Sequence, residues 1–161
     1  MAIVHAHPLS GPIAALAPMP AFVDAALSRV PRDRWIERPG PEAFSLVEQA
    51  CHLRDVEREG YLVRVRRMLE EEMPRLAGFD GAAAARQRDY LSQDAKVAAQ
   101  QFAAARAEVV ALLSATTPDQ LERGAMFMDE RITLADLVHL MVEHDREHRD
   151  EIAALADGLE G

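Results

Sequence analysis

The feature that most constrains the fold is an apolar stripe near the C-terminus that two histidines interrupt. The stripe repeats at helical spacing and consists of Leu134, Leu137, Met141, Ile152 and Leu155. His144 and His148 are spaced i, i+4, so on a helix their rings project from one face, about 40° apart around the axis. His148 falls within the stripe and His144 on its edge, where burial without partners costs free energy. A bound transition metal would satisfy both rings, so the pair is a candidate metal clamp.

Helical spacing of apolar residues recurs in three earlier stretches. With the C-terminal stripe, the sequence predicts four long helices, at residues 19–30, 46–72, 93–115 and 134–157. Ser45 with Glu48, and Thr133 with Asp136, have the spacing of capping boxes, and Ser92 is the expected cap of the third helix. We see no convincing pair of strands. The expected fold class is therefore all-α, a four-helix bundle.

The remaining segments set the expected domain organisation. A chain of 161 residues fits one domain, which we place at residues 18–161. Residues 1–17 carry two prolines and a glycine and are expected to form an extended lead-in. Residues 73–92 are long for a connection within a bundle, so they form either a partly helical crossover or a covering loop. Residues 122–132 are expected to be irregular or briefly extended.

Charge and cysteine content narrow the class of function. The formal net charge of −9 opposes a general nucleic-acid role, because phosphate binding needs a concentrated positive surface, and it also opposes docking on anionic lipid. The single cysteine, Cys51, rules out an internal disulfide and fits a reducing cytoplasm. Residues 1–20 have no basic segment followed by a long apolar run, so we expect neither a signal peptide nor a membrane span.

A third metal ligand has to come from another helix, and His52 is the only histidine elsewhere in the expected helices. It shares a ridge with Val56 and Val63, so we expect it to face the bundle. Three neutral imidazoles commonly bind zinc, nickel, iron or cobalt, and they leave at least one coordination position open for water or substrate. The alternative is a surface pair of histidines, or core histidines bonded to backbone. The position of the pair on an apolar stripe favours the metal.

The other candidate ligands are expected to lie elsewhere. His139 points about 140° away from the pair by helical arithmetic, so we exclude it. His5 and His7 lie in the lead-in and are expected to be a solvated tail. Cys51 precedes His52 and points about 100° away from it, so we interpret Cys51 as a small buried hydrophobe.

Four carboxylates are expected near the histidines on the helix faces: Glu48, Asp55, Glu59 and Glu151. Asp55 follows His52 by three residues, and Glu151 follows His148 by three. These two are the leading candidates to accept a histidine N–H or to act as a catalytic base for bound water. The alternative is that they form only the solvated edge of each helix.

The chain resembles the DinB-like superfamily over about residues 18–157. The resemblance is carried by Ser45–Glu57 and Thr133–His148, and Asp89-Tyr90 before the third helix also matches. The family pattern has one histidine early in the second helix and a pair spaced i, i+4 in the last helix. His52, His144 and His148 occupy these positions.

The resemblance implies an up-up-down-down four-helix bundle, a divalent metal held by the three histidines at one end, and frequent homodimers. It implies less about chemistry. Some relatives resemble metal-dependent hydrolases, and others resemble transferases that place a low-molecular-weight thiol, mycothiol or bacillithiol, on the metal. Many members have no known reaction.

Two functions follow as expectations. The first is an enzyme whose divalent metal (zinc or nickel foremost, otherwise iron, cobalt or manganese) lowers the pKa of a small thiol and aims it at an electrophile, or activates water for hydrolysis. A nearby carboxylate would handle protons. The second is a non-catalytic metal-binding or stress-response protein in which the metal is structural. A relative that has kept the ligands and lost the activity is a third alternative. The expected partners are a small-molecule thiol or electrophile, without nucleic acid or membrane.

Overall fold

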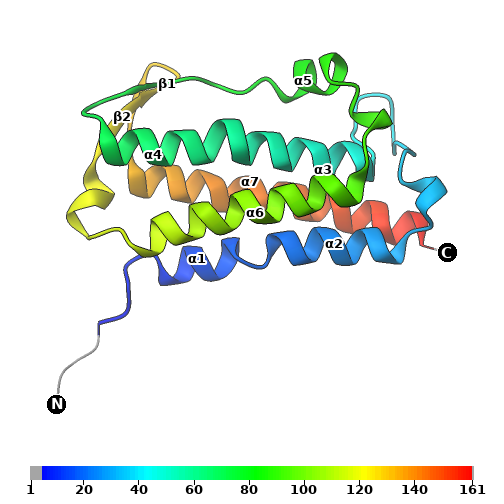
Figure 1. Ribbon diagram of the computed structural model, residues 1–161, viewed down its shortest axis with the longest axis horizontal. Helices are drawn as coiled ribbons and strands as arrows, with labels where there is room; N and C mark the ends of the chain where they lie inside the picture. Colours follow the sequence, from blue (N-terminus) through cyan, green and yellow to red (C-terminus); the bar gives the residue numbers. More distant parts are fainter. Residues whose placement is uncertain (1–4, 161) are drawn as a thin grey trace.

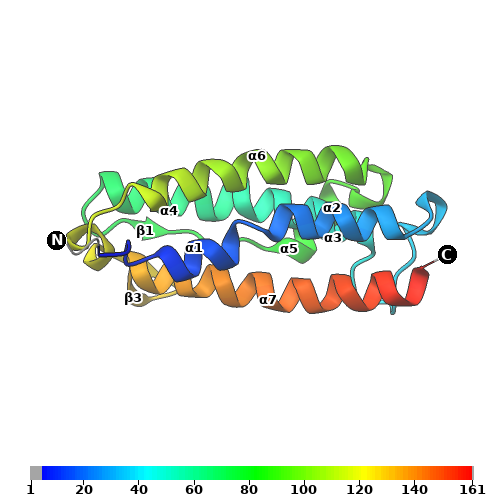
Figure 2. The same cartoon turned by 90° about the horizontal axis from the view of Figure 1, so that it is seen from below.

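The computed structural model describes residues 5–160 and shows a four-helix bundle with a minor sheet (Figures 1 and 2). Residues 1–4 of the expected lead-in and residue 161 of the expected domain lie outside the described residues. The α-helices are α1 (Ser10–Leu16), α2 (Met19–Arg29), α3 (Leu46–Asp55), α4 (Leu62–Glu70), α5 (Gly81–Gln87), α6 (Ala95–Ser114) and α7 (Leu134–Leu159). The strands are β1 (Arg75–Leu76), β2 (Gly124–Phe127) and β3 (Glu130–Thr133). Short 3₁₀ turns lie at Arg32–Arg34, Tyr90–Ser92 and Asp119–Glu122, and a π-helical segment, η2, spans Val56–Tyr61.

Four rods make up the bundle: α1 with α2, α3 with α4, α6, and α7. Following the chain in Figure 1, the first rod and α7 run in one direction, whereas α3–α4 and α6 both run in the other. The connection that carries α5 crosses the length of the bundle between α4 and α6, so the two middle rods are parallel. The topology is therefore up-down-down-up, and the expected up-up-down-down order was wrong. The open alternative for residues 73–92 is resolved as a partly helical crossover.

Side-chain caps begin the helices that carry the site. Both expected capping boxes are confirmed: Ser45 caps α3 with Glu48, and Thr133 caps α7 with Asp136. The expected cap of α6 was wrong, because Asp94 takes that position and accepts hydrogen bonds from two backbone N–H groups of the first turn. A carboxylate can accept both bonds at once, and the expected cap was misplaced by two residues.

The second rod contains a π-helical turn, and this turn changes which residues face the bundle. The segment η2 follows α3 directly and leads into α4 without a break. A π turn holds one extra residue, so every later residue shifts by one position around the axis. Val63, expected on the inner ridge, is 42% exposed, whereas Arg64 is only 7% exposed. The expected inward position of Val63 was therefore wrong, and a charged residue takes its place.

The lead-in is not extended throughout. Ser10–Leu16 forms α1, and the side chains of Leu16 and of Leu9, the residue before the helix, are buried in the core. His7 is partly buried, and its Nε2 lies 2.7 Å from the backbone oxygen of Thr116. The expectation of a solvated tail was therefore wrong for His7, whereas His5 is exposed. The extended form was inferred from two prolines and a glycine. Burial of the Leu9 and Leu16 side chains stabilises the helical form in spite of these residues.

Residues 10–29 form a stretch that is long and apolar enough to cross a membrane by length and composition alone. In the bundle this stretch is broken between Leu16 and Met19. Both halves pack against α6 and α7, and Val23 and Leu27 are buried there. We therefore interpret it as a bundle rod rather than a membrane span.

A small sheet closes one end of the bundle (Figure 1). β2 pairs antiparallel with β3, and β1 pairs in parallel with β2. The expectation of no strand pair was wrong. Met128 and Asp129 form the two-residue connection of the hairpin with positive φ angles of 50° and 63°. Tight hairpins usually have asparagine and glycine at such positions, so the pair Met128-Asp129 did not indicate a hairpin in the sequence.

The core consists of two apolar clusters separated by a polar layer. One cluster packs α2, α3 and the C-terminal half of α7, and the other packs α1, α4 and the N-terminal half of α7. Between them Arg106 of α6 is buried and bonds to the carboxylates of Glu57 and Asp145. The three histidines belong to the same middle region, since His144 and His148 lie between Met141 and Ile152 of the two clusters. The site therefore lies in the middle of the bundle. The resemblance implied a site at one end, and that expectation was wrong.

Candidate metal centre

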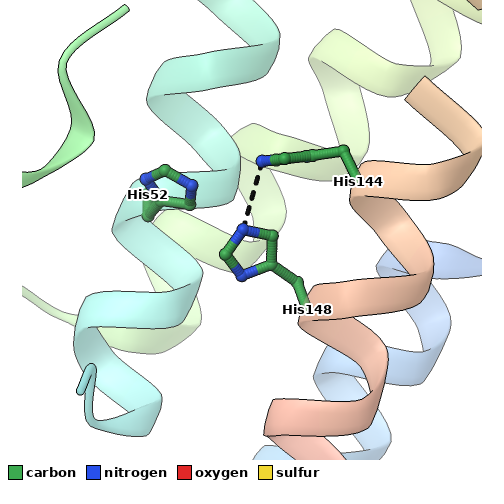
Figure 3. A group of neighbouring side chains, drawn as sticks. All are labelled: His52, His144 and His148. Carbon is green, nitrogen blue, oxygen red and sulfur yellow. Dashed lines mark hydrogen bonds between the residues drawn. The ribbon is translucent and has the colours of Figure 1, made fainter. Parts of the chain in front are cut away.

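The three histidines converge on one point between α3 and α7. Each offers a ring nitrogen, and these three atoms lie within 4.8 Å of one another. His144 and His148 face each other with their Nε2 atoms 3.1 Å apart, as the dashed line in Figure 3 shows. His52 comes from the opposite helix, with its ring centre 4.7 Å from that of His148 and 5.6 Å from that of His144. The structure brings together the three residues that the sequence singled out.

Gln49 and Glu151 hold the ring of His148. Its Nδ1 lies 2.8 Å from the side-chain oxygen of Gln49 and 3.3 Å from a carboxylate oxygen of Glu151. The amide of Gln49 also donates a hydrogen bond of 2.6 Å to Glu151. If Nδ1 of His148 carries the proton, its Nε2 presents a lone pair toward His144, which is how metal-binding histidines are usually oriented. Glu151 thus contacts a site histidine, as expected, and Gln49 is a contact that sequence reasoning missed.

Several ring nitrogens at this point have no protein partner. Within residues 5–160, both nitrogens of His52 and Nδ1 of His144 are buried and make no hydrogen bond. Leaving such groups unsatisfied costs on the order of 1–3 kcal/mol each. Imidazole nitrogens are preferred ligands of zinc, nickel, iron and cobalt, and one nitrogen from each of the three rings lies within 4.8 Å of the other two. The donor set therefore fits a divalent transition metal.

The charge state of the rings also suits a metal. Burial, followed by the nearby His148 ring, lowers the pKa of His52 to about 4. Burial, with neighbouring histidines and the arginines Arg106 and Arg64, lowers the pKa of His144 to about 3. Burial also lowers the pKa of His148, although Glu151 opposes that shift. All three rings are neutral near pH 7, so their lone pairs are free to bind a cation.

Gly81, the first residue of α5, fixes one side of the His52 ring. A Cβ atom on Gly81 would lie 2.7 Å from Cε1 and 2.8 Å from Nδ1 of His52. Gly81→Ala should therefore displace the ring and weaken zinc binding about tenfold or more, the effect typical of disturbing a ligand's support. Isothermal titration calorimetry with zinc measures this change.

Gly78→Ala is the matched control, because a Cβ at Gly78 meets no atom of the described chain within 4 Å. This variant should bind zinc as the wild type does. Equal zinc affinity in both variants would contradict the assignment of His52 as a ligand.

A cavity of about 480 Å³ opens onto two of the three histidines, His52 and His144. Its walls come from the second rod, the crossover, the β2–β3 hairpin and α7: His52, Val56, Tyr61, Arg64, Gly78, Phe79, Asp80, Phe127, Met128 and His144. A volume of this size fits a small molecule, and most of the lining is apolar. The 73–92 and 122–132 segments contribute Phe79 and Phe127 to it.

The carboxylate of Asp55 is bonded to residues other than the histidines. One of its oxygens accepts a hydrogen bond from Arg54, and the other accepts from Arg88 and from the hydroxyl of Tyr90. Burial alone would raise the pKa of Asp55, but the bonds from Arg54 and Tyr90 lower it. No bond to His52 forms, so the expected partnership with that ring was wrong. Asp55 instead fastens the crossover to α3, and its role as a base stays a prediction.

The remaining candidates lie away from the three-histidine group. Glu48 is bonded to Arg38 and caps α3, and Glu59 pairs with Arg88. Cys51 is fully buried, and burial raises the pKa of its thiol to about 11, so the expected small buried hydrophobe fits. His139 is exposed, as its exclusion required.

The fold and the three-histidine group can be compared with those of known protein families and structures. The profile of the DinB superfamily matches residues 16–152, which is most of the chain. The chain belongs to the DinB superfamily. No curated protein matches this DinB superfamily member.

Two solved structures share the fold of this DinB superfamily chain. YfiT from Bacillus subtilis matches with a TM-score of 0.85 at 23% sequence identity, covering 98% of this chain and 90% of YfiT. It is described as a probable metal-dependent hydrolase with an unusual four-helix bundle topology. YjoA, a DinB-like protein from Bacillus subtilis, matches with a TM-score of 0.56 at 16% identity, covering 91% of this chain and 90% of YjoA. At these identities the likeness concerns the fold.

Proposed function

We propose that this DinB superfamily protein is a metal-dependent enzyme acting on a small molecule, with His52, His144 and His148 as the metal ligands. The observation that carries the proposal is that the cavity of about 480 Å³ is lined by His52 and His144 themselves. A structural metal usually has four protein ligands, whereas three ligands beside a cavity leave room for a reactant. When bound, the metal supplies Lewis acidity, which lowers the pKa of a thiol or water molecule at the open position.

A thiol nucleophile would have to come from outside the chain. Cys51 is the only cysteine, and its thiol is buried with a pKa raised to about 11, so it is a poor nucleophile near neutral pH. The reactant is therefore a diffusible thiol or water. We favour a thiol transferase, with a low-molecular-weight thiol such as mycothiol or bacillithiol and an electrophilic acceptor. Hydrolysis is the close variant, and the description of YfiT as a probable metal-dependent hydrolase supports it.

The protein's own residues orient the reacting groups. Gln49 and Glu151 fix the tautomer and direction of His148, and Gly81 leaves room for His52. Glu151 is 55% exposed on its side chain, so it can exchange a proton with solvent. We infer that Glu151 is the better candidate for proton transfer, because both oxygens of Asp55 are already engaged by arginines and Tyr90.

Spectroscopy of the cobalt-substituted protein tests the thiol version. Adding small thiols, with mycothiol, bacillithiol and glutathione as the probes, should produce a sulfur-to-cobalt charge-transfer band with at least one of them. The same titration with γ-glutamylserylglycine, the hydroxyl analogue of glutathione, should not produce this band. A spectrum that does not respond to any of the thiols would contradict the transferase and leave hydrolysis as the supported chemistry.

The alternative function is a non-catalytic metal-binding or stress-response protein in which the metal joins α3 to α7. One observation favours it: His52 and His148 lie on different helices, so a metal bound by both would hold these helices together. In that case a fourth protein ligand would complete the coordination, and neither thiols nor hydrolysable esters would react. A cytoplasmic location, a homodimer and the absence of nucleic-acid or membrane partners stay predictions.

A further inference from the structure

The guanidinium of Arg64 is a buried cation in the wall of the cavity. Arg64 is 7% exposed and lines the same cavity as His52 and His144. The π-helical turn η2 puts it there, because the extra residue rotates Arg64 onto the face that His52 occupies one element earlier. π turns inside longer helices are found frequently at functional sites.

The surroundings of Arg64 hold its plane in one orientation. The guanidinium carbon lies 5.3 Å from the centre of the Tyr61 ring and 4.8 Å from the centre of the Phe127 ring. Nε and Nη2 both donate to the backbone oxygen of Ala77, at 3.3 Å and 3.1 Å. These contacts come from the second rod, the hairpin and the crossover. They fix the side chain and leave the edge that carries Nη1 without a hydrogen bond among residues 5–160.

Arg64 differs from the other buried arginines in having no counter-charge. Arg106 is bonded to both Glu57 and Asp145, and Arg54 is bonded to Asp55. Among the described residues, no carboxylate lies within ion-pair distance of Arg64. Burial without an anion lowers the pKa of Arg64, and such a charge costs free energy unless an anion compensates it. An unpaired cation that faces a small-molecule cavity is the arrangement that binds an anionic ligand.

We propose that Arg64 binds a carboxylate of the substrate, so that the substrate class is small organic acids with an apolar body. The proposal rests on the metal-dependent function proposed above and names its substrate class. The apolar body fits against Val56, Phe79 and Phe127, which line the same cavity as Arg64 and the histidines His52 and His144. Arg64 is the only cationic side chain among the residues that line the cavity, which suits a carboxylate of one negative charge better than a phosphate of nearly two. Arg64 would therefore select the substrate and position it beside the histidines.

Ligand-detected ¹⁹F NMR tests the proposal with 4-fluorobenzoate and the neutral isostere 4-fluorobenzamide as probes. Both are titrated into zinc-loaded protein and into protein stripped of metal, because a carboxylate could also bind zinc directly. The wild type should prefer the carboxylate over the amide by about tenfold or more in both forms. Arg64→Met should remove this preference and still bind one zinc per chain. Arg64→Lys should fall between the two, because it keeps the charge and loses the planar donor edge.

Arg66→Met is the matched control, because it makes the same charge change on the same helix at an exposed residue that pairs with Glu108. It should keep the wild-type preference. Thermal unfolding by circular dichroism establishes that each variant is folded, and Arg64→Lys carries the test if Arg64→Met does not fold. Absence of carboxylate preference in the wild type, or an unchanged preference in a folded Arg64 variant, would overturn the proposal. If the wild-type protein bound no zinc, the metal function would be refuted. The carboxylate preference would still be tested, because it is also measured on protein without metal.

Discussion

Replacing His148 with alanine is expected to abolish stoichiometric zinc binding by the purified protein. His148 is the ring that the protein orients most firmly, through Gln49 and Glu151, and its Nε2 lies 3.1 Å from Nε2 of His144. Its loss leaves two imidazoles, too few to hold zinc at a three-ligand site. We expect affinity to fall by more than about 100-fold, beyond the 10–100-fold typical of losing a residue that only supports a ligand. Inductively coupled plasma mass spectrometry of protein made without a histidine tag measures the number of zinc ions per chain.

His139→Ala is the matched control for this experiment. His139 lies on the same helix, α7, and is exposed rather than turned toward the site. This variant should retain wild-type zinc content, which separates a specific ligand from the general loss of a histidine. Full zinc occupancy in His148→Ala would mean that His148 is not a ligand.

The second large effect is expected at Arg106. Arg106→Met removes the only cation bonded to the buried carboxylates Glu57 and Asp145, within the part of the chain that the structure describes. Breaking a buried ion pair by removing one partner costs roughly 3–5 kcal/mol, because a charge is left buried without compensation. The change also frees the π-helical turn, since Glu57 belongs to it. Urea denaturation should show a free energy of unfolding lower by about that amount, at pH 7.

A surface pair provides the comparison for this loss. Arg66→Met removes an exposed arginine whose partner is Glu108, and exposed pairs contribute about 0.2–1 kcal/mol. Its unfolding free energy should therefore stay within about 1 kcal/mol of the wild type. If Arg106→Met lost no more than Arg66→Met, the polar layer would not be held together by Arg106.

The three clustered histidines could be found from the sequence because each lies on a regular helix with strong local signals. The period of 3.6 residues places His144 and His148 on one face, and the capping boxes at Ser45 and Thr133 fix where both helices begin. His52 then followed because it was the only histidine in another expected helix. These signals depend only on residues that are close together in the chain, so they do not depend on how the helices pack.

The parts that sequence reasoning missed depend on contacts between distant segments. Arg64 faces the cavity only because η2 adds a residue to the second rod, and nothing in the helical period announces a π turn. Gln49 joins the site through α7, and the β2–β3 hairpin turns at Met128 and Asp129 without the usual turn residues. The order of the rod directions depends on where the long crossover lies, and the order that the resemblance implied was wrong. These features therefore required the three-dimensional structure.

Anomalous diffraction at the zinc absorption edge, from crystals of the zinc-loaded protein, tests the central claim most directly. We predict one strong peak at about 2.0–2.1 Å from a ring nitrogen of each of His52, His144 and His148, the usual distance for zinc bound to imidazole. The peak should border the cavity that Arg64 lines. A peak bound elsewhere, or one that only two of these rings reach, would contradict the proposed metal centre and the enzyme built on it.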